Sequence, residues 1–168
     1  SRTIHRHCAM TPFTPLVTIA IPTWNRADRL LPETLRSALG QQYANIEVLV
    51  SDNASTDNTA ELVASFHDSR IRYLRQSRNG GAEANFDSLL AEARGDYLLY
   101  LNDDDTIDPD LLERALAACS AARPPVLIRT GTRVVDDRGR TMYEVPGADR
   151  SVDLRETLSH WSRSETAF

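Results

Sequence analysis

The feature that most constrains the fold is an alternation between short apolar runs rich in β-branched residues and longer segments with helical periodicity. The apolar runs lie at 16–23, 46–53, 71–76 and 96–101, and the periodic segments between them at 27–42, 58–68 and 82–93. This alternation indicates βαβ units, whose strands form a mostly parallel sheet with helices against its faces. The sequence therefore predicts an α/β fold.

Local signals support individual helices. Asn58 and Glu61 have the spacing of a capping box, which predicts a helix start at that point. A later helix is expected to bury Phe86, Leu89 and Leu90.

A further helix and a hairpin are expected after the fourth apolar run. The helix is predicted over 110–122, with Asp108 as its N-cap and Pro109 at its first position. A strand and hairpin are expected over 126–145, with the turn at "DDRG".

The whole chain is expected to hold one domain. We predict a flexible leader at 1–15, a folded domain at 16–145 and a tail at 146–168. In the leader, His5 and His7 could in principle bind a metal together with Cys8, but a flexible segment is the preferred interpretation.

Composition and charge narrow the partners. The net charge of −5 predicts no general basic surface, which disfavours nucleic acid as the main partner. Cys8 and Cys119 lie far apart, which indicates neither a zinc site nor a disulfide framework. No apolar run approaches the roughly 20 residues of a membrane helix. We expect a cytoplasmic protein, with a peripheral position at the inner face of the membrane left open.

Polar clusters follow each of the four predicted strands. They read "PTWNR", "SDNASTDNT", "SRNGG" and "NDDD". Ligands of open parallel sheets bind at the carboxyl ends of the strands, where such clusters converge. Together the four clusters outline a binding site.

Three consecutive aspartates, Asp103, Asp104 and Asp105, are the most unusual of these clusters. Neighbouring carboxylates repel, so a positive group is expected close by. A hydrated surface turn is one interpretation. The preferred one is a divalent cation, Mg²⁺ or Mn²⁺, which takes one or two protein carboxylates and completes its shell with water and substrate phosphates.

Two other acidic motifs do not match. An EF-hand that started at Asn102 would have Ile107 where its sharp turn requires glycine. A phosphatase of the haloacid dehalogenase type carries its paired aspartates on the first strand, whereas here they follow the fourth.

The other two clusters allow alternatives when read alone. Asp52 at the end of a strand either accepts a hydrogen bond from a base or a ribose, or caps the next helix. Arg75 and Arg78 flank the "RNGG" region either as phosphate partners or within a plain loop.

Taken in order, these segments resemble the nucleotide-binding half of family 2 glycosyltransferases, which have the GT-A fold. The resemblance extends over about residues 16–117, from "VTIAIPTWNR" through "SALGQQYANIEVLVSDNASTDNT" to "NDDD" and "DPDLLERAL". It implies a Rossmann-like, mostly parallel sheet flanked by helices. On this basis residues 16–145 are expected to form a GT-A nucleotide-sugar-binding domain, and the tail at 146–168 is expected to be the start of a truncated or missing acceptor region. The resemblance further implies transfer of a sugar from a nucleotide-diphosphate donor to an acceptor hydroxyl, with inversion at the anomeric carbon.

The resemblance also implies roles for single residues. The residues that match its nucleotide-binding loops are Pro22, Thr23, Asn25, Arg78, Asn79 and Gly80, and Asp52 matches the carboxylate that contacts the base. "NDDD" matches the family's DxD region. There Asn102 stands at the first acidic position, Asp103 at the variable position near the ribose and Asp104 at the principal metal ligand. Asp105 would take that role if the register shifted by one.

The general base of the reaction is not identified. In the family it is an aspartate or glutamate downstream of the DxD region, usually in an acidic pair. Asp149, Asp153 and Glu156 lie downstream, but none stands in a matching context.

The sequence predicts the sugar donor and the acceptor only by chemical class. UDP-, dTDP- and GDP-linked sugars are the donors considered, and a polysaccharide or other glycan, a lipid-linked glycan or a small molecule the acceptors. The alternative function is a nucleotide- or nucleotide-sugar-binding module that acts through a partner without doing chemistry. A nucleotidyltransferase would need a glycine-rich basic loop after the first strand, which "PTWNRADR" does not supply.

Overall fold

The computed structural model describes residues 14–27, 30–120, 128, 130–136 and 138–147. The chain divides into two compact units, residues 1–111 and residues 112–168. The predictions for residues 1–13 of the leader, for the last two residues of the helix at 110–122 and for the tail beyond residue 147 concern residues outside these ranges.

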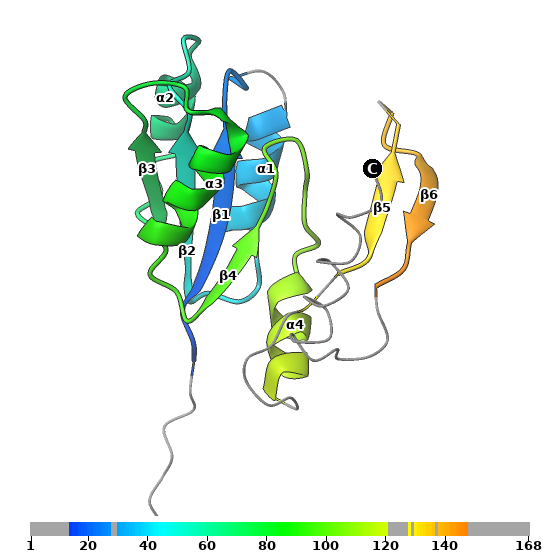
Figure 1. Ribbon diagram of the computed structural model, residues 1–168. Helices are drawn as coiled ribbons and strands as arrows, with labels where there is room; N and C mark the ends of the chain where they lie inside the picture. The colour runs from blue at the N-terminus through cyan, green and yellow to red at the C-terminus, as the bar shows by residue number, and fades with distance from the viewer. Residues whose placement is uncertain (1–13, 28–29, 121–127, 129, 137, 148–168) are drawn as a thin grey trace, which may run out of the picture. The chain divides into compact units, whose positions relative to one another are not determined.

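The first unit is built on a four-stranded parallel sheet in the order β3-β2-β1-β4 (Figure 1). Its strands are β1 (Val17–Thr23), β2 (Ile46–Asp52), β3 (Ile71–Arg75) and β4 (Tyr97–Tyr100). Ile19, Ala20 and Ile21 of β1 are fully buried because strands flank β1 on both sides and helices cover its faces. The predicted α/β fold with a mostly parallel sheet is confirmed.

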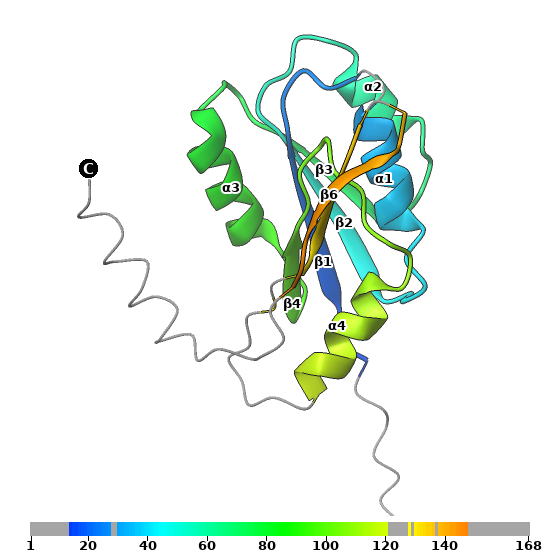
Figure 2. The ribbon, with the colours of Figure 1, turned by 90° about the vertical axis from the view of Figure 1, so that its right-hand side faces the viewer.

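The helices of this unit cover both faces of the sheet. Helices α1 (Leu30–Leu39) and α2 (Thr59–Ala64) lie on one face, and α3 (Gly81–Glu92) lies on the other (Figure 2). The chain steps from β1 to β2 to β3 in one direction and then reverses to reach β4. Because βαβ crossovers are right-handed, this reversal places α3, which connects β3 to β4, on the face opposite α1 and α2.

The start of α2 differs from the prediction. Asn58 makes no side-chain cap hydrogen bond, so the predicted capping box is wrong. The preceding Asp57 supplies the acceptor instead, because its Oδ1 receives both the amide of Thr59, at 3.1 Å, and its hydroxyl, at 2.5 Å. A carboxylate is a stronger acceptor than an amide oxygen, and it satisfies the first turn from one position earlier.

Helix α3 buries a narrower face than predicted. Leu89 and Asn85 are buried, Phe86 is half-buried and Leu90 is 63% exposed. Asn85 and Leu89 are four residues apart and share one face, whereas each step along a helix rotates the next side chain away by 100°. Burial of Leu90 was therefore a wrong expectation.

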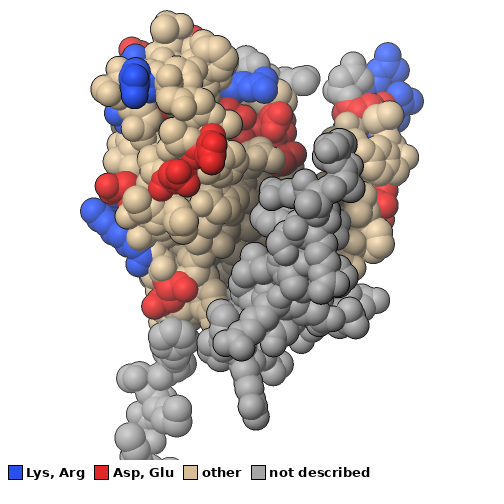
Figure 3. Space-filling view, viewed as in Figure 1, with Lys and Arg blue, Asp and Glu red and all other residues tan. Residues whose placement is uncertain are grey.

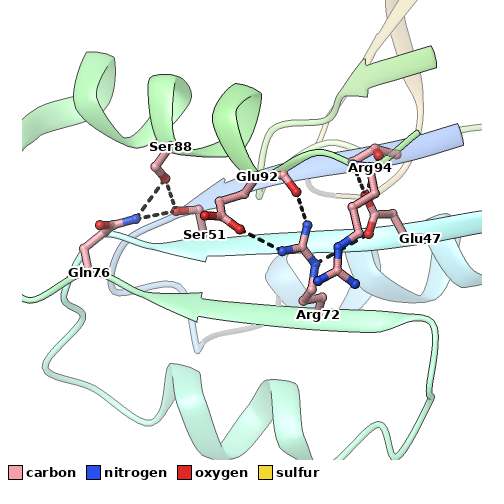
Figure 4. Close-up of polar contacts among 8 residues, drawn as sticks. Glu47, Ser51, Arg72, Gln76, Ser88, Glu92 and Arg94 are labelled. Atoms are coloured by element: carbon pink, nitrogen blue, oxygen red, sulfur yellow. Dashed lines mark hydrogen bonds and ion pairs between the residues drawn. The ribbon is translucent and has the colours of Figure 1, made fainter. Parts of the chain in front are cut away.

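Buried polar contacts hold α3 against the sheet (Figure 4). Ser51 Oγ of β2 donates to Asn85 Oδ1 at 2.6 Å. The same oxygen lies 2.8 Å from Ser88 Oγ (Figure 4). Gln76 Nε2 donates to Ser88 Oγ at 2.8 Å. The hydroxyl and amide groups between helix and sheet thus satisfy one another.

A charged cluster joins β1, β2, β3 and the end of α3. Glu47 Oε1 accepts hydrogen bonds from Thr18 Oγ1, at 2.6 Å, and from the Arg94 amide, at 2.7 Å. Arg72 Nε lies 3.5 Å from the other Glu47 oxygen, and its Nη1 donates to Glu92 Oε2 at 3.0 Å (Figure 4). Burial of Glu47 alone would raise the pKa of its carboxyl, but the hydrogen bonds and the arginines outweigh it, so this pKa is lowered.

The second unit contains most of α4 (Leu111–Ser120) and a two-stranded antiparallel hairpin, β5 (Thr132–Val135) and β6 (Thr141–Val145). The predicted turn is present. Asp136 Oδ1 accepts the amides of Arg138 and Arg140, and Gly139 takes the left-handed φ of 76° that the turn requires. None of the helices in the described ranges has the length and apolar content needed to cross a membrane.

Candidate functional site

The candidate site lies where the strand order of the sheet reverses, between β1 and β4. Ligands of open α/β sheets bind outside the carboxyl ends of the strands at such a switch point. Thr23 is the last residue of β1, and the acidic loop at 102–105 follows β4. The fold therefore brings the first and last of the four polar clusters together.

Helix α1 holds the acidic loop in place. Thr34 Oγ1 donates to the Asp105 carbonyl at 2.7 Å, and Ser37 Oγ accepts the Ile107 amide at 3.2 Å. Gln41 Nε2 donates to the Asp108 carbonyl at 2.8 Å. Because these contacts involve the loop's backbone, they fix its path and leave its carboxylates available to other partners.

Asp103 is the most enclosed of the three consecutive aspartates 103–105. Its side chain is 14% exposed, and its Oδ2 accepts a 2.8 Å hydrogen bond from Thr23 Oγ1. Burial raises the pKa of the Asp103 carboxyl, and the neighbouring Asp104 carboxylate adds to the rise, while Thr23 and Arg26 oppose it. Asp103 is thus a fixed acceptor at the base of the loop.

Arg26 supplies the positive group that three adjacent carboxylates require. Its Nε lies 3.8 Å from Asp103 Oδ1, and its Nη2 lies 3.8 Å from Asp104 Oδ2. Acidic and basic side chains adjoin at the upper end of the first unit in Figure 3, the end at which the arrows of Figure 1 finish. The sequence predicted a positive group without naming it. The available signal was a basic residue in the loop after β1.

Asp104 is the aspartate best placed to hold a cation. Its side chain is 46% exposed, and no hydrogen bond to it is found in the described part of the chain. Asp105 differs, because its Oδ2 accepts a 2.9 Å hydrogen bond from Asn102 Nδ2.

The side chains near Asp104 suit a metal site that is completed by substrate phosphates and water. Within the described ranges, no group of three or more His, Cys, Asp and Glu side chains is arranged to hold a metal ion. Mg²⁺ and Mn²⁺ commonly use one or two protein carboxylates and take their other ligands from substrate phosphates and water. The residues present therefore fit a cation that arrives with a diphosphate, and Asp104 would hold it.

Asp52 ends β2 and is fully buried. Its Oδ1 accepts the Ser55 amide at 2.8 Å, and its Oδ2 accepts the hydroxyl of Tyr73. Burial and this hydrogen bond to Asp52 both raise the pKa of Tyr73. The contact with Ser55 stabilises the turn after β2, and the alternative that Asp52 caps the next helix is wrong, because Asp57 bonds the first turn of α2. Contact of Asp52 with a base stays a prediction.

Asn25 joins the loop after β1 to the loop after β2. Its φ of 54° lies in the left-handed region, where asparagine is tolerated better than most residues. Its amide donates to Ser55 Oγ at 2.8 Å, and its Oδ1 accepts the Thr56 amide at 2.8 Å. Pro22, in strand β1 just before this loop, is half-buried and pairs with Ser51 of β2.

The loop after β3 is tied to the same edge through Asn53, which the sequence had not singled out. Asn53 Oδ1 accepts the Gly80 amide at 2.9 Å, and its Nδ2 donates to Asn79 Oδ1 at 2.9 Å. Arg78 is exposed, and its role toward a phosphate stays a prediction. All four polar clusters thus meet at one edge of the sheet, and hydrogen bonds link the clusters to one another.

Known proteins were compared with this chain by sequence and by structure. The model of glycosyl transferase family 2 matches residues 18–163. The succinoglycan biosynthesis protein ExoO of Rhizobium meliloti (strain 1021) is 34% identical over 154 residues, which cover 92% of this chain and 44% of that protein. Glycosyltransferase GlyG of Streptococcus pneumoniae serotype 4 is 26% identical over 162 residues, which cover 91% of this chain and 54% of that protein.

Solved structures show the same fold. The mannosyltransferase PcManGT from Pyrobaculum calidifontis, in complex with GDP-Man and Mn²⁺, matches with a TM-score of 0.60 and 29% identity, over 76% of this chain and 37% of that one. S. aureus TarS in complex with UDP-GlcNAc matches with a TM-score of 0.59 and 23% identity, over 71% of this chain and 40% of that one. These neighbours confirm the expected GT-A fold.

The chain spans only part of the proteins that it resembles, 44% of ExoO and 54% of GlyG. The family model nevertheless covers most of the chain, from strand β1 to beyond the hairpin. The expected resemblance is confirmed on this basis: the chain belongs to glycosyl transferase family 2.

Proposed function

We propose that this chain binds the donor of an inverting glycosyltransferase, which moves a sugar from a nucleotide diphosphate to an acceptor hydroxyl with the help of Mg²⁺ or Mn²⁺. The observation that carries the proposal is the pair Asp103 and Asp104 at the end of β4, with Thr23 and Arg26 beside it. One carboxylate is enclosed and fixed, and the other is exposed and accepts no hydrogen bond within the described ranges. This arrangement supports separate roles for the two.

The chemistry of this edge and the ligands of the neighbours support a class of donor. UDP-GlcNAc and GDP-Man are the donors bound in two similar structures, and the second also holds Mn²⁺. We propose a UDP-, dTDP- or GDP-linked sugar for this chain. Its base would lie toward Asp52, Asn79 and Gly80, and its diphosphate toward Asp104.

The residues would divide the binding of the donor between them. Asp103, held by Thr23, would accept a hydrogen bond from a ribose hydroxyl. Asp104 would hold the cation, which when bound supplies Lewis acidity for the charge that develops on the departing diphosphate. Asn25 would hold the loop after β1 against the loop after β2 through its hydrogen bonds to Ser55 and Thr56.

Inversion requires the acceptor oxygen to attack the face opposite the leaving diphosphate, with a general base to take its proton. No described residue is assigned as this base, and the downstream acids Asp149, Asp153 and Glu156 lie outside the described ranges. We propose a glycan, lipid-linked or small-molecule acceptor. The relative ExoO is a succinoglycan biosynthesis protein, which favours a polysaccharide as the acceptor. We also propose that the reaction takes place in the cytoplasm, either free in solution or at the inner face of the membrane.

Calorimetric titration with UDP, dTDP and GDP, with and without Mn²⁺, tests the donor site. We expect one nucleotide to bind and Mn²⁺ to strengthen its binding. Folded protein that binds none of the three would contradict the proposal.

A second assay addresses the chemistry. The matching nucleotide sugar is incubated with the protein and Mn²⁺, and its transfer to acceptors or to water is followed by chromatography. Tight donor binding with neither transfer nor hydrolysis would favour the alternative of a binding module that does no chemistry.

A further inference from the structure

The backbone of Arg26 is held on both sides, whereas its side chain is not. Before it, the Asn25 amide donates to Ser55 Oγ at 2.8 Å, and after it the Ala27 amide donates to Asp57 Oδ2 at 3.0 Å. The Arg26 side chain is 40% exposed, and its two contacts with carboxylates measure 3.8 Å, longer than hydrogen bonds. The position of Arg26 is therefore fixed, while its guanidinium is free to exchange partners.

The present partners of Arg26 are the two carboxylates assigned to the donor. Its Nη2 faces Asp104 Oδ2, on the side chain proposed to hold the cation. A divalent cation on Asp104 would lie within a few ångströms of the guanidinium and repel it. Asp103 would keep its hydrogen bond from Thr23 and would not be left without a donor. Arg26 would then need another anion.

The diphosphate of the donor supplies that anion. A planar guanidinium forms two parallel hydrogen bonds with phosphate oxygens, which an ammonium group cannot reproduce. A diphosphate held at Asp104 through the cation would come within reach of Arg26, whose guanidinium already lies 3.8 Å from the Asp104 carboxylate.

We propose that Arg26 is an exchangeable counter-ion. It neutralises Asp103 and Asp104 in the free protein and moves to the donor's diphosphate when a divalent cation replaces it on Asp104. This inference rests on the proposed function and adds a positioning residue that couples cation binding to phosphate binding.

The variant Arg26→Gln separates the two states. With Mn²⁺ alone, electron paramagnetic resonance of the free ion should show several-fold tighter binding, because no guanidinium competes for Asp104. At saturating Mn²⁺, calorimetry with the nucleotide that wild type binds should show about tenfold weaker binding, the loss of a charged hydrogen bond. Loss of a merely structural contact would weaken both, so the opposite directions identify the exchange.

Two control variants sharpen the test. Arg26→Lys keeps the charge without the planar fork, so Mn²⁺ alone should bind as in wild type and the nucleotide should bind between wild type and Arg26→Gln. Arg36→Gln removes a positive charge from an exposed position of α1 and should change neither. Circular dichroism checks the folding of each variant. If Arg26→Gln does not fold, Arg26→Lys decides, since wild-type nucleotide binding by it would overturn the contact with phosphate.

The outcomes separate this inference from the proposed function. Changes in the same direction in both titrations, or no change in either, would overturn the exchange while nucleotide binding by wild type supports the donor site. Wild-type protein that binds no nucleotide with Mn²⁺ would overturn both.

Discussion

Thr23 Oγ1 donates a 2.8 Å hydrogen bond to Asp103 Oδ2, although 80 residues separate the two. The bond joins the end of β1 to the loop after β4, at the point where the strand order reverses. It therefore connects the framework of the sheet to the acidic loop of the candidate site.

Replacing Thr23 with valine keeps the shape of the side chain and removes this donor. Because Thr23 is 2% exposed and Asp103 is largely enclosed, we expect the free energy of unfolding to fall by about 1–2 kcal/mol. Urea denaturation measures the change. Thr23→Ser retains the hydroxyl and serves as the control. A Thr23→Val variant as stable as wild type would show that the hydrogen bond to Asp103 does not stabilise the fold.

Asp104→Asn should abolish the strengthening of nucleotide binding by Mn²⁺ and leave the fold intact, because the side chain is 46% exposed and holds no buried partner. Asp105→Asn is the matched control. Its carboxylate is already bonded to Asn102, so metal-dependent binding should persist. The reverse pattern in calorimetry would place the metal ligand one residue later, and unchanged binding in Asp104→Asn at saturating Mn²⁺ would reject its metal role.

Asn25 combines a left-handed φ with a side-chain bond to the Thr56 amide. Asn25→Gly keeps the backbone accessible and loses the bond, whereas Asn25→Ala also meets steric strain at φ 54°. We expect the alanine variant to be less stable than the glycine variant by about 1 kcal/mol, as measured by thermal or urea denaturation. Equal stability of the two would show that the loop relaxes out of this conformation.

Glu47→Gln should lower the free energy of unfolding at pH 7 by about 2 kcal/mol, because the enclosed carboxylate is paired with Arg72 and two hydrogen-bond donors. Glu144→Gln removes the same charge from an exposed pair with Arg133, and its effect should be close to zero.

The effect of Glu47 also depends on pH. Its pKa in the folded chain lies below the ordinary value of 4.5, so its stabilisation is complete above about pH 4.5 and is lost as the pH falls through the folded pKa. Wild type and Glu47→Gln should therefore converge in urea denaturation below that pH. A difference that stays constant down to acid unfolding would show that the effect does not come from the carboxylate charge.

Much of the fold follows from local patterns in the sequence. Runs of buried apolar residues such as Val48, Leu49 and Val50 predict strands, and the periodic segments between them predict crossover helices. The wrong predictions for α2 and α3 concern which of two adjacent side chains accepts a hydrogen bond and which is buried. Asp57 rather than Asn58 takes the first turn of α2, and Leu90 faces solvent, because the choice of acceptor and the width of a buried face depend on the surroundings.

The sequence by itself determined that four polar clusters meet at one edge of a parallel sheet, since carboxyl ends of parallel strands share an edge. Apart from the family resemblance, it could not distinguish Asp103, Asp104 and Asp105, which are chemically identical and adjacent. Only the tertiary structure made them different, since the path of their loop along α1 turns the first toward Thr23, leaves the second exposed beside Arg26 and pairs the third within its own turn. A carboxylate takes its role from the groups that face it, and those groups come from other parts of the chain.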